Sequence, residues 1–347
     1  MSDSPAAQAQ AVHERAIIID GRDPTYLVYR QSKEEKAEYW PVLKASGITA
    51  SVVDVPWTDD GFREGAINFA LWHERVGSRT DAVIVKTVDD IRSAKAAGKH
   101  AFILSTQTPT IVEDDVRFLR VFYEMGLRVM QVTYQKRNLL ADGCGEPANG
   151  GLSKFGREVI AEMNRLGISI DLSHAGDRTM DETIEASAAP VFFSHSNARA
   201  RADVSRNVPD ATLKRLAERG GICGISAFSA FIKPGGGTTG TTLEDYVDML
   251  DYVVDLIGID KVSMGFDVGE FRTPFELSTI GGGDPSRPHD VTVRYVRELN
   301  SRTGLPLLTE TLIRRGYDEA SISKVYGENL MNFFEKTWAP AKVAVAA

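Results

Sequence analysis

The sequence predicts an α/β fold, a (β/α)8 barrel of the TIM type. About nine short apolar runs have the composition of buried strands, and most precede a segment with apolar residues at helical spacing. Strands that alternate with helices in this way indicate parallel β-α-β units. Eight strands close such a barrel, so one strand is expected to lie outside it. The alternative, an open doubly wound sheet, has no support from a Rossmann motif, because no GxGxxG lies between the first strand and its helix.

The predicted elements alternate along the chain from residue 16 to residue 336. The predicted strands are Ala16–Asp20, Ile48–Val55, Val83–Val85, Ala101–Leu104, Val129–Tyr134, Ile168–His174, Pro190–His195, Gly221–Phe228 and Val262–Asp267. The predicted helices are Lys33–Ser46, 59–78, Val88–Ala97, Val112–Met125, Lys154–Leu166, Met180–Ala186, Asp210–Arg219, Leu243–Ile257 and three segments between Val291 and Lys336. The Gly-rich stretches 235–240 and 281–283 are predicted loops.

Two of these predicted helices rest on clear patterns of apolar residues. Helical spacing of apolar residues predicts the helix over 59–78, and the face of Phe118, Leu119, Phe122 and Met125 predicts the one that ends at Met125. Residues 16–340 are predicted to form a single barrel domain with helices at its C-terminal end, behind a flexible tail of residues 1–15. No internal repeat or linker divides this domain.

The composition indicates a globular enzyme without a nucleic-acid or membrane partner. The chain has 40 basic and 48 acidic residues, and its net charge of −8 argues against binding to a phosphate backbone. No apolar run approaches the roughly 18 residues of a membrane span, and the N-terminus lacks the apolar core of a signal peptide. Cys144 and Cys223 form no disulfide framework and are expected to be reduced thiols. These features predict a cytoplasmic protein.

Polar residues gather where the predicted strands end. In a (β/α)8 barrel the carboxyl ends of the strands form the active-site mouth. The side chains expected there are Asp20, Asp23, Gln107, Tyr134, His174, His195 and Asp267, with Arg206 on a nearby loop.

His174 and His195 are the most informative of these residues. Each follows a serine at the end of an apolar run, in ISIDLSH and PVFFSH, and together they are two of only six histidines. The structural interpretation is two hydrogen-bonded histidines at strand ends. The functional interpretation, which we prefer, is that both bind one metal ion, since neutral imidazole is a common ligand of Zn²⁺.

Asp267 and Arg206 each have a functional and a structural interpretation. Asp267, at the end of KVSMGFD, can be a metal ligand, a general acid/base or an anchor for a substrate ammonium group, or it caps the next loop. Arg206 can hold a substrate carboxylate with two parallel hydrogen bonds, or it forms a surface ion pair.

At these residues the sequence resembles the membrane (renal) dipeptidase family of zinc peptidases. The resemblance runs from about Ala16 to Phe334. Its specific stretches are GREVIAEMNRLGISIDLSHAG, APVFFSHSNARA followed by RNVPD, ERGGICGIS, DLIGIDKVSMGFD, and LIRRGY with GENLMNFF. The family's fold is a metal-dependent hydrolase barrel of the amidohydrolase-like kind.

The resemblance implies roles for four residues. His174 and His195 match the two histidines on the family's second metal, and their separation of 21 positions is also that of the family. Arg206 matches the arginine that binds the carboxylate at the C-terminal end of the substrate. Asp267 matches the aspartate near the amino end of the substrate, which is proposed to move the proton.

The sequence departs from the family at the first metal. Family members carry His-x-Asp after Asp-Gly, whereas Arg22-Asp23-Pro24 follows here. The bridging glutamate is replaced by Gln107, and a substrate-contacting histidine by Tyr134. We therefore expect Arg22, Asp23, Gln107 and Tyr134 to contact substrate. At most one zinc ion is expected on the two histidines, with Asp23 or Tyr134 as an additional ligand, or no metal at all. Arg22 would repel a cation or replace its charge.

Three functions follow from this pattern. The first is a metal-assisted hydrolase of the dipeptidase type, which cleaves an amide bond in a small carboxylate-bearing substrate such as a dipeptide, with Asp267 as the catalytic residue. The second is a hydrolase or lyase that acts on a non-peptide carboxylate with one metal or none. The third is a non-catalytic ligand-binding homologue, against which the retained mouth residues argue. Barrels of this kind often form homodimers, although no surface stripe in the sequence indicates one.

Overall fold

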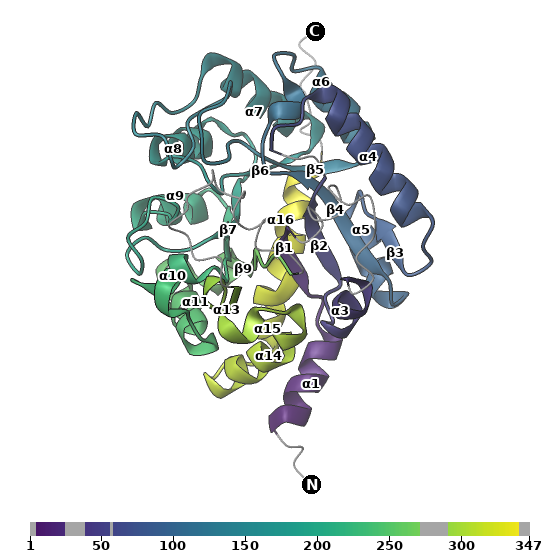
Figure 1. The fold of residues 1–347 in the computed structure, drawn as a ribbon, viewed down its shortest axis with the longest axis vertical. Helices are drawn as coiled ribbons and strands as arrows, with labels where there is room; N and C mark the ends of the chain where they lie inside the picture. Colours follow the sequence, from purple (N-terminus) through teal and green to yellow (C-terminus); the bar gives the residue numbers. More distant parts are fainter. Residues whose placement is uncertain (1–4, 25–38, 56–57, 271–290, 340–347) are drawn as a thin grey trace.

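The fold is a parallel β-barrel surrounded by helices (Figure 1). The computed structural model describes residues 5–24, 39–55, 58–270 and 291–339. Eight strands follow one another around the barrel, in the order β1 (Ile19–Asp23), β2 (Ala50–Asp54), β4 (His100–Thr106), β5 (Leu127–Gln131), β6 (Ser169–Asp171), β7 (Phe192–Ser196), β8 (Ile222–Ile225) and β9 (Val262–Met264). The predicted fold class is confirmed.

The ninth strand, β3 (Ala82–Ile84), lies outside the barrel, as predicted. It pairs with the first residues of β4, whereas β5 pairs with the last ones, from Leu104 onward. The seven residues of β4 are therefore long enough to hold two neighbours on the same edge. β9 meets β1 just beyond its own last residue, where the Asp267 N–H donates to the Arg22 carbonyl at 3.1 Å.

Helices cover the outside of the barrel (Figure 1). Their bounds are α1 (Pro5–Arg15), α3 (Tyr39–Ala45), α4 (Phe62–Gly77), α5 (Val88–Ala96), α6 (Phe118–Glu124), α7 (Lys154–Leu166), α8 (Asp177–Ala186), α9 (Asp210–Glu218), α10 (Gly236–Thr239), α11 (Leu243–Ile257), α13 (Val291–Arg294), α14 (Leu305–Arg314), α15 (Glu319–Ser323) and α16 (Asn329–Thr337). Local chemistry sets their ends. The Ser153 hydroxyl accepts the Gly156 N–H at the start of α7, and Gly167 ends that helix with a left-handed φ of 83°.

Two segments differ from the sequence-based prediction, and two others lie partly or wholly outside the described residues. Residues 5–15 form α1 rather than a flexible tail, because Ala9 and Val12 give this helix a buried apolar face. The helix expected from Val112 begins at Phe118, since Glu113 has a φ of 50° that an α-helix cannot contain. Residues 33–38 of the predicted helix Lys33–Ser46 and the loop 281–283 lie outside the described residues, and the rest of that helix is observed as α3. The division into one barrel domain remains a prediction.

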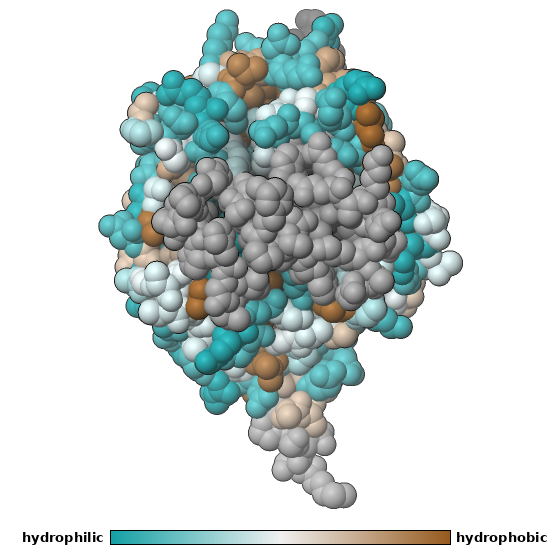
Figure 2. Space-filling view, in the orientation of Figure 1, coloured by the Kyte–Doolittle hydropathy of each residue, from teal (hydrophilic) through white to brown (hydrophobic). Residues whose placement is uncertain are grey.

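The described surface shows neither a membrane span nor a broad apolar patch on the face in view. Among the described helices, none combines the length and the apolar composition that a bilayer crossing needs. Figure 2 shows that the coloured apolar residues on this face are small spots among hydrophilic ones.

The barrel interior is too narrow for an added side chain at Gly265. A Cβ on this residue would lie 1.8 Å from the carbonyl oxygen of Ser194. We expect Gly265→Ala to lower the free energy of unfolding by about 2 kcal/mol or more, measured by urea denaturation. Gly77→Ala is the matched control, because nothing lies within 4 Å of a Cβ there. Equal stability of the two variants would contradict this account of the interior.

Candidate active site

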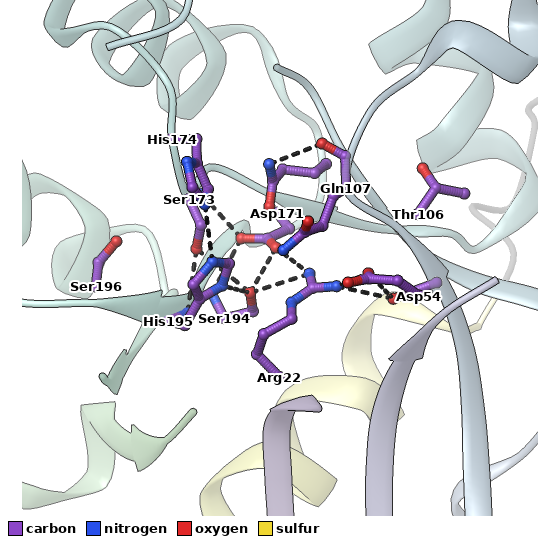
Figure 3. Close-up of polar contacts among 12 residues, drawn as sticks. Arg22, Asp54, Thr106, Gln107, Asp171, Ser173, His174, Ser194, His195 and Ser196 are labelled. Atoms are coloured by element: carbon purple, nitrogen blue, oxygen red, sulfur yellow. Dashed lines mark hydrogen bonds and ion pairs between the residues drawn. The ribbon is translucent and has the colours of Figure 1, made fainter. Parts of the chain in front are cut away.

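A buried arginine occupies the centre of the barrel mouth (Figure 3). The Arg22 side chain is 0% exposed, and its guanidinium forms ion pairs with Asp54 and with Asp171, the latter at 2.9 Å. It also donates to the hydroxyl oxygens of Ser105 and Ser194 at 3.1 and 3.3 Å. Five strands, β1, β2, β4, β6 and β7, thus contribute one polar side chain each to a single cluster.

Arg22 remains charged in this position. Burial by itself would lower the pKa of its guanidinium, but the carboxylates of Asp54 and Asp171 outweigh burial and raise the pKa above its ordinary value. The cluster is therefore a buried ion-pair network, in which one cation binds two carboxylates.

The two predicted histidines lie beside this cluster and face each other. The Nε2 atoms of His174 and His195 are 3.0 Å apart. The Ser194 hydroxyl donates its single hydrogen to Asp171 at 2.5 Å, so the 2.7 Å contact with His195 is a donation from Nδ1 of the imidazole. In neutral His195 the Nε2 lone pair is then directed at His174. Asp171 thereby orients His195 through Ser194 while it also binds Arg22.

The electrostatics keep His195 neutral. Burial lowers its pKa well below the ordinary value, and the positive charges of Arg206 and Arg22 lower it further. A neutral imidazole is the form that binds a metal ion. Tyr134 stacks on the other histidine, with ring centroids 4.3 Å apart, and so fixes the plane of His174.

Backbone conformation marks two of the predicted site residues. His174 and Asp267 have φ values of 67° and 57°, in the left-handed region that non-glycine residues rarely adopt. Such conformations are kept where the surroundings impose them, and they concentrate at functional sites. The Asp267 N–H donates to the Arg22 carbonyl, which places this aspartate at the mouth with its side chain half-buried.

Arg206 lies on the other side of His195. Its guanidinium donates to the Ser196 hydroxyl and to the His195 carbonyl, both at 2.7 Å. The residue is 4% exposed, its Nε has no hydrogen-bond partner in the described structure, and burial lowers its pKa. It also borders a cavity of about 210 Å³. Arg206 is thus a buried cation whose N–H donors are not all used by the protein.

Asp23 and Gln107, two further predicted residues, contact other parts of the chain. The Asp23 carboxylate accepts from the Arg302 guanidinium at 2.5 Å and from the Tyr39 hydroxyl at 3.2 Å, in a buried group that also contains Glu270. Gln107 follows β4, near the Arg22 cluster in Figure 3, and its backbone carbonyl accepts from Gln131 at 2.8 Å.

Sequence reasoning missed Asp54, Asp171 and Ser194. The first two are carboxylates inside apolar strand sequences, VVD and SID, and this was the available signal. A charged residue within a buried strand requires a partner, and here that partner is Arg22.

The residues at the family's first metal position do not fit a divalent cation. Arg22 stands where the resemblance places a histidine ligand, and its guanidinium already occupies the carboxylates of Asp54 and Asp171. Gln107 is a neutral amide, and Asp23 is bound to Arg302. The Arg22 guanidinium would itself repel a cation placed beside it.

The second position does fit one ion. Two imidazoles with Nε2 atoms 3.0 Å apart can bind the same metal, and the Asp171–Ser194 pair supplies the outer hydrogen bond that metal-bound histidines use. In the described part of the chain, no third His, Cys, Asp or Glu completes a metal-binding group with them.

Comparison with known proteins identifies the family of this barrel. Residues 6–282 match the family model described as membrane dipeptidase, peptidase family M19. The chain belongs to the membrane dipeptidase family. Dipeptidase 3 of Rattus norvegicus is 30% identical over 356 residues, which cover 95% of this chain and 67% of that protein. Dipeptidase tcpJ of Claviceps purpurea is 30% identical over 245 residues, which cover 70% of this chain and 52% of that protein.

Solved structures agree with this membership. An amidohydrolase from Pseudomonas aeruginosa is 31% identical, with a TM-score of 0.85 over 95% of this chain and 99% of the other. The metallopeptidase dipeptidase AC, of family M19, is 25% identical, with a TM-score of 0.78 over 93% and 99%. The chain spans about half to two thirds of the length of the curated relatives it matches.

The Arg22 cluster generates a stability prediction. Arg22→Ala leaves Asp54 and Asp171 buried without their cation, so we expect a loss of about 3–5 kcal/mol in the free energy of unfolding. Arg165→Ala, which breaks an exposed pair with Glu162, is expected to cost less than about 1 kcal/mol. Urea denaturation measures both variants, and similar losses in the two would refute the structural role of Arg22.

Proposed function

We propose that this member of the family hydrolyses an amide bond in a small substrate that carries a carboxylate, such as a dipeptide. The observation that supports this function is the facing pair of imidazoles, His174 and His195, at the barrel mouth with Arg206 next to them. A zinc ion on the two histidines would polarise the scissile carbonyl and make bound water more acidic. We propose one such ion per chain at most.

The chain's own residues provide binding and proton transfer in this proposal. Arg206 has unused N–H donors and binds the substrate carboxylate. This interaction orients the amide bond toward the histidines. Asp267, half-buried at the mouth, takes a proton from the attacking water and delivers it to the leaving nitrogen. Arg22 supplies a fixed positive charge in place of the family's first metal.

The position of Arg22 also supports a second candidate function. A guanidinium is always protonated and cannot generate a hydroxide, so it replaces the charge of a metal ion and none of its acid-base chemistry. A hydrolase or lyase that acts on a non-peptide carboxylate depends less on a metal-activated water at the first metal position than a two-metal peptidase does. Metal dependence and a panel of dipeptides and N-acyl amino acids separate the two candidates.

Metal content tests the role of the two histidines. We expect about one ion per purified chain, lost in His174→Ala because a single imidazole binds zinc weakly, and activity that disappears on chelation and returns with zinc. His73→Ala is the matched control, since His73 lies exposed on α4 and donates to or accepts from no mouth residue in the described structure. Elemental analysis and dipeptide assays measure these outcomes. A metal-free protein that still turns over substrate would overturn the metal-assisted proposal.

The proposed binding of the substrate carboxylate by Arg206 can be tested separately. We expect Arg206→Ala to raise KM about 10- to 100-fold for substrates with a free carboxylate, and far less for the same substrates as C-terminal amides. The comparison of acid with amide corrects for any general damage to the site. Equal effects on acid and amide would remove this role from Arg206.

A further inference from the structure

A largely apolar cavity lies beside the arginine that is proposed to bind the substrate carboxylate. Its volume is about 210 Å³, and Arg206 forms part of its wall. Apolar atoms make up most of that wall, which includes the side chains of Val204, Phe228, Ala230 and Phe231. Because an apolar cavity of about 150 Å³ can hold a benzene ring, this one is large enough for a leucine or phenylalanine side chain.

The aromatic part of the wall has a fixed geometry. The rings of Phe228 and Phe231 are stacked with centroids 4.5 Å apart, and the Tyr295 ring meets Phe228 edge-on at 5.8 Å. The guanidinium carbon of Arg206 lies 5.5 Å from the Phe231 centroid, and that of Arg294 lies 5.6 Å from the Phe228 centroid. Packing on both rings therefore holds this part of the wall in place without a ligand.

The cavity also borders the segments that carry the two histidines. Cys144 lines it, and the N–H of this residue donates to the His174 carbonyl at 2.7 Å. Arg206 donates to the His195 carbonyl, also at 2.7 Å. In a dipeptide, one carbon atom carries the α-carboxylate, the nitrogen of the scissile amide and the C-terminal side chain. With the carboxylate on Arg206 and the amide toward the histidines, that side chain needs space beside both, and the cavity provides it.

We propose that this cavity binds the side chain of the C-terminal residue, so that the enzyme favours dipeptides that end in an apolar residue such as leucine or phenylalanine. Burial against the apolar wall removes such a side chain from water, whereas a polar one of the same shape loses its hydrogen bonds to water. This inference rests on the proposed hydrolase function, which places the substrate carboxylate on Arg206. It adds Val204 and Ala230 as residues that determine specificity.

The kinetic test compares three dipeptides. Ala-Gly lacks the C-terminal side chain of Ala-Leu, and Ala-Asn has a side chain of nearly the same shape that is polar. We expect kcat/KM for Ala-Leu to exceed that for each of the others by at least about 10-fold. A value for Ala-Gly or Ala-Asn equal to or above that for Ala-Leu would overturn the proposal.

Two substitutions fill the cavity from different parts of its wall. Ala230→Leu and Val204→Phe should each lower kcat/KM for Ala-Leu at least about 10-fold more than for Ala-Gly, because the added atoms occupy the space of the leucine side chain. Ala96→Leu is the matched control, since Ala96 is exposed at the end of α5, and it should leave the preference unchanged. Equal losses with the two dipeptides in both filled variants would show that the cavity does not hold this side chain.

Binding without turnover separates this proposal from the proposed function. Isothermal titration of the purified protein with L-leucine, L-asparagine and glycine, which have a carboxylate and no peptide bond, should show leucine binding at least about 10-fold more tightly than the other two. Preferred binding of leucine with no hydrolysis of any of the three dipeptides would support the cavity and refute the hydrolase. Hydrolysis of all three dipeptides at equal rates, with equal binding of the amino acids or none, would overturn the cavity proposal and leave the hydrolase standing.

Discussion

Two carboxylates, Asp54 and Asp171, project from β2 and β6 into the mouth of the barrel, and the guanidinium of Arg22 binds both. A buried charge without a partner costs several kcal/mol, so each of these groups is tolerated only because the others are present. The same interaction reaches the rest of the site. Asp171 also accepts from Ser194, which orients His195, and the backbone of Arg22 accepts from Asp267. The geometry of both histidines and of the proposed acid/base thus depends on one ion-pair network.

This network explains how the barrel keeps the fold of its family although the residues at the first metal position differ. A dication binds carboxylates through short, strong contacts and activates water, whereas a guanidinium binds them through directed N–H donors and activates nothing. Arg22 therefore places one positive charge at the first position without the chemistry of a metal ion. In the proposed hydrolase, catalysis then depends on the neighbouring histidine pair, on the metal ion that the pair would hold, and on the fixed charges around it.

Arg206, the proposed ligand of the substrate carboxylate, lies outside the Arg22 cluster. The Arg22 cluster pairs one guanidinium with two buried carboxylates, while Arg206 forms no ion pair with any described carboxylate and borders a cavity with an apolar wall. The first arrangement stabilises the mouth, and the second suits the role proposed for Arg206. His195 connects the two, because its Nδ1 contacts Ser194 and its carbonyl accepts from Arg206.

The sequence by itself determined the class of fold, the one strand outside the barrel and the pairing of His174 with His195. These follow from local patterns, namely apolar runs, helical spacing and polar residues at strand ends, which do not depend on distant contacts. It did not identify Asp54 and Asp171 as the partners of Arg22, or Arg302 as the partner of Asp23, since these residues are brought together across up to 279 positions. Only barrel closure decides which charges meet at the centre, because parallel strands far apart in sequence end at the same mouth. The same closure brings the Arg22 guanidinium, which the sequence predicted at the mouth, against the buried carboxylates of Asp54 and Asp171.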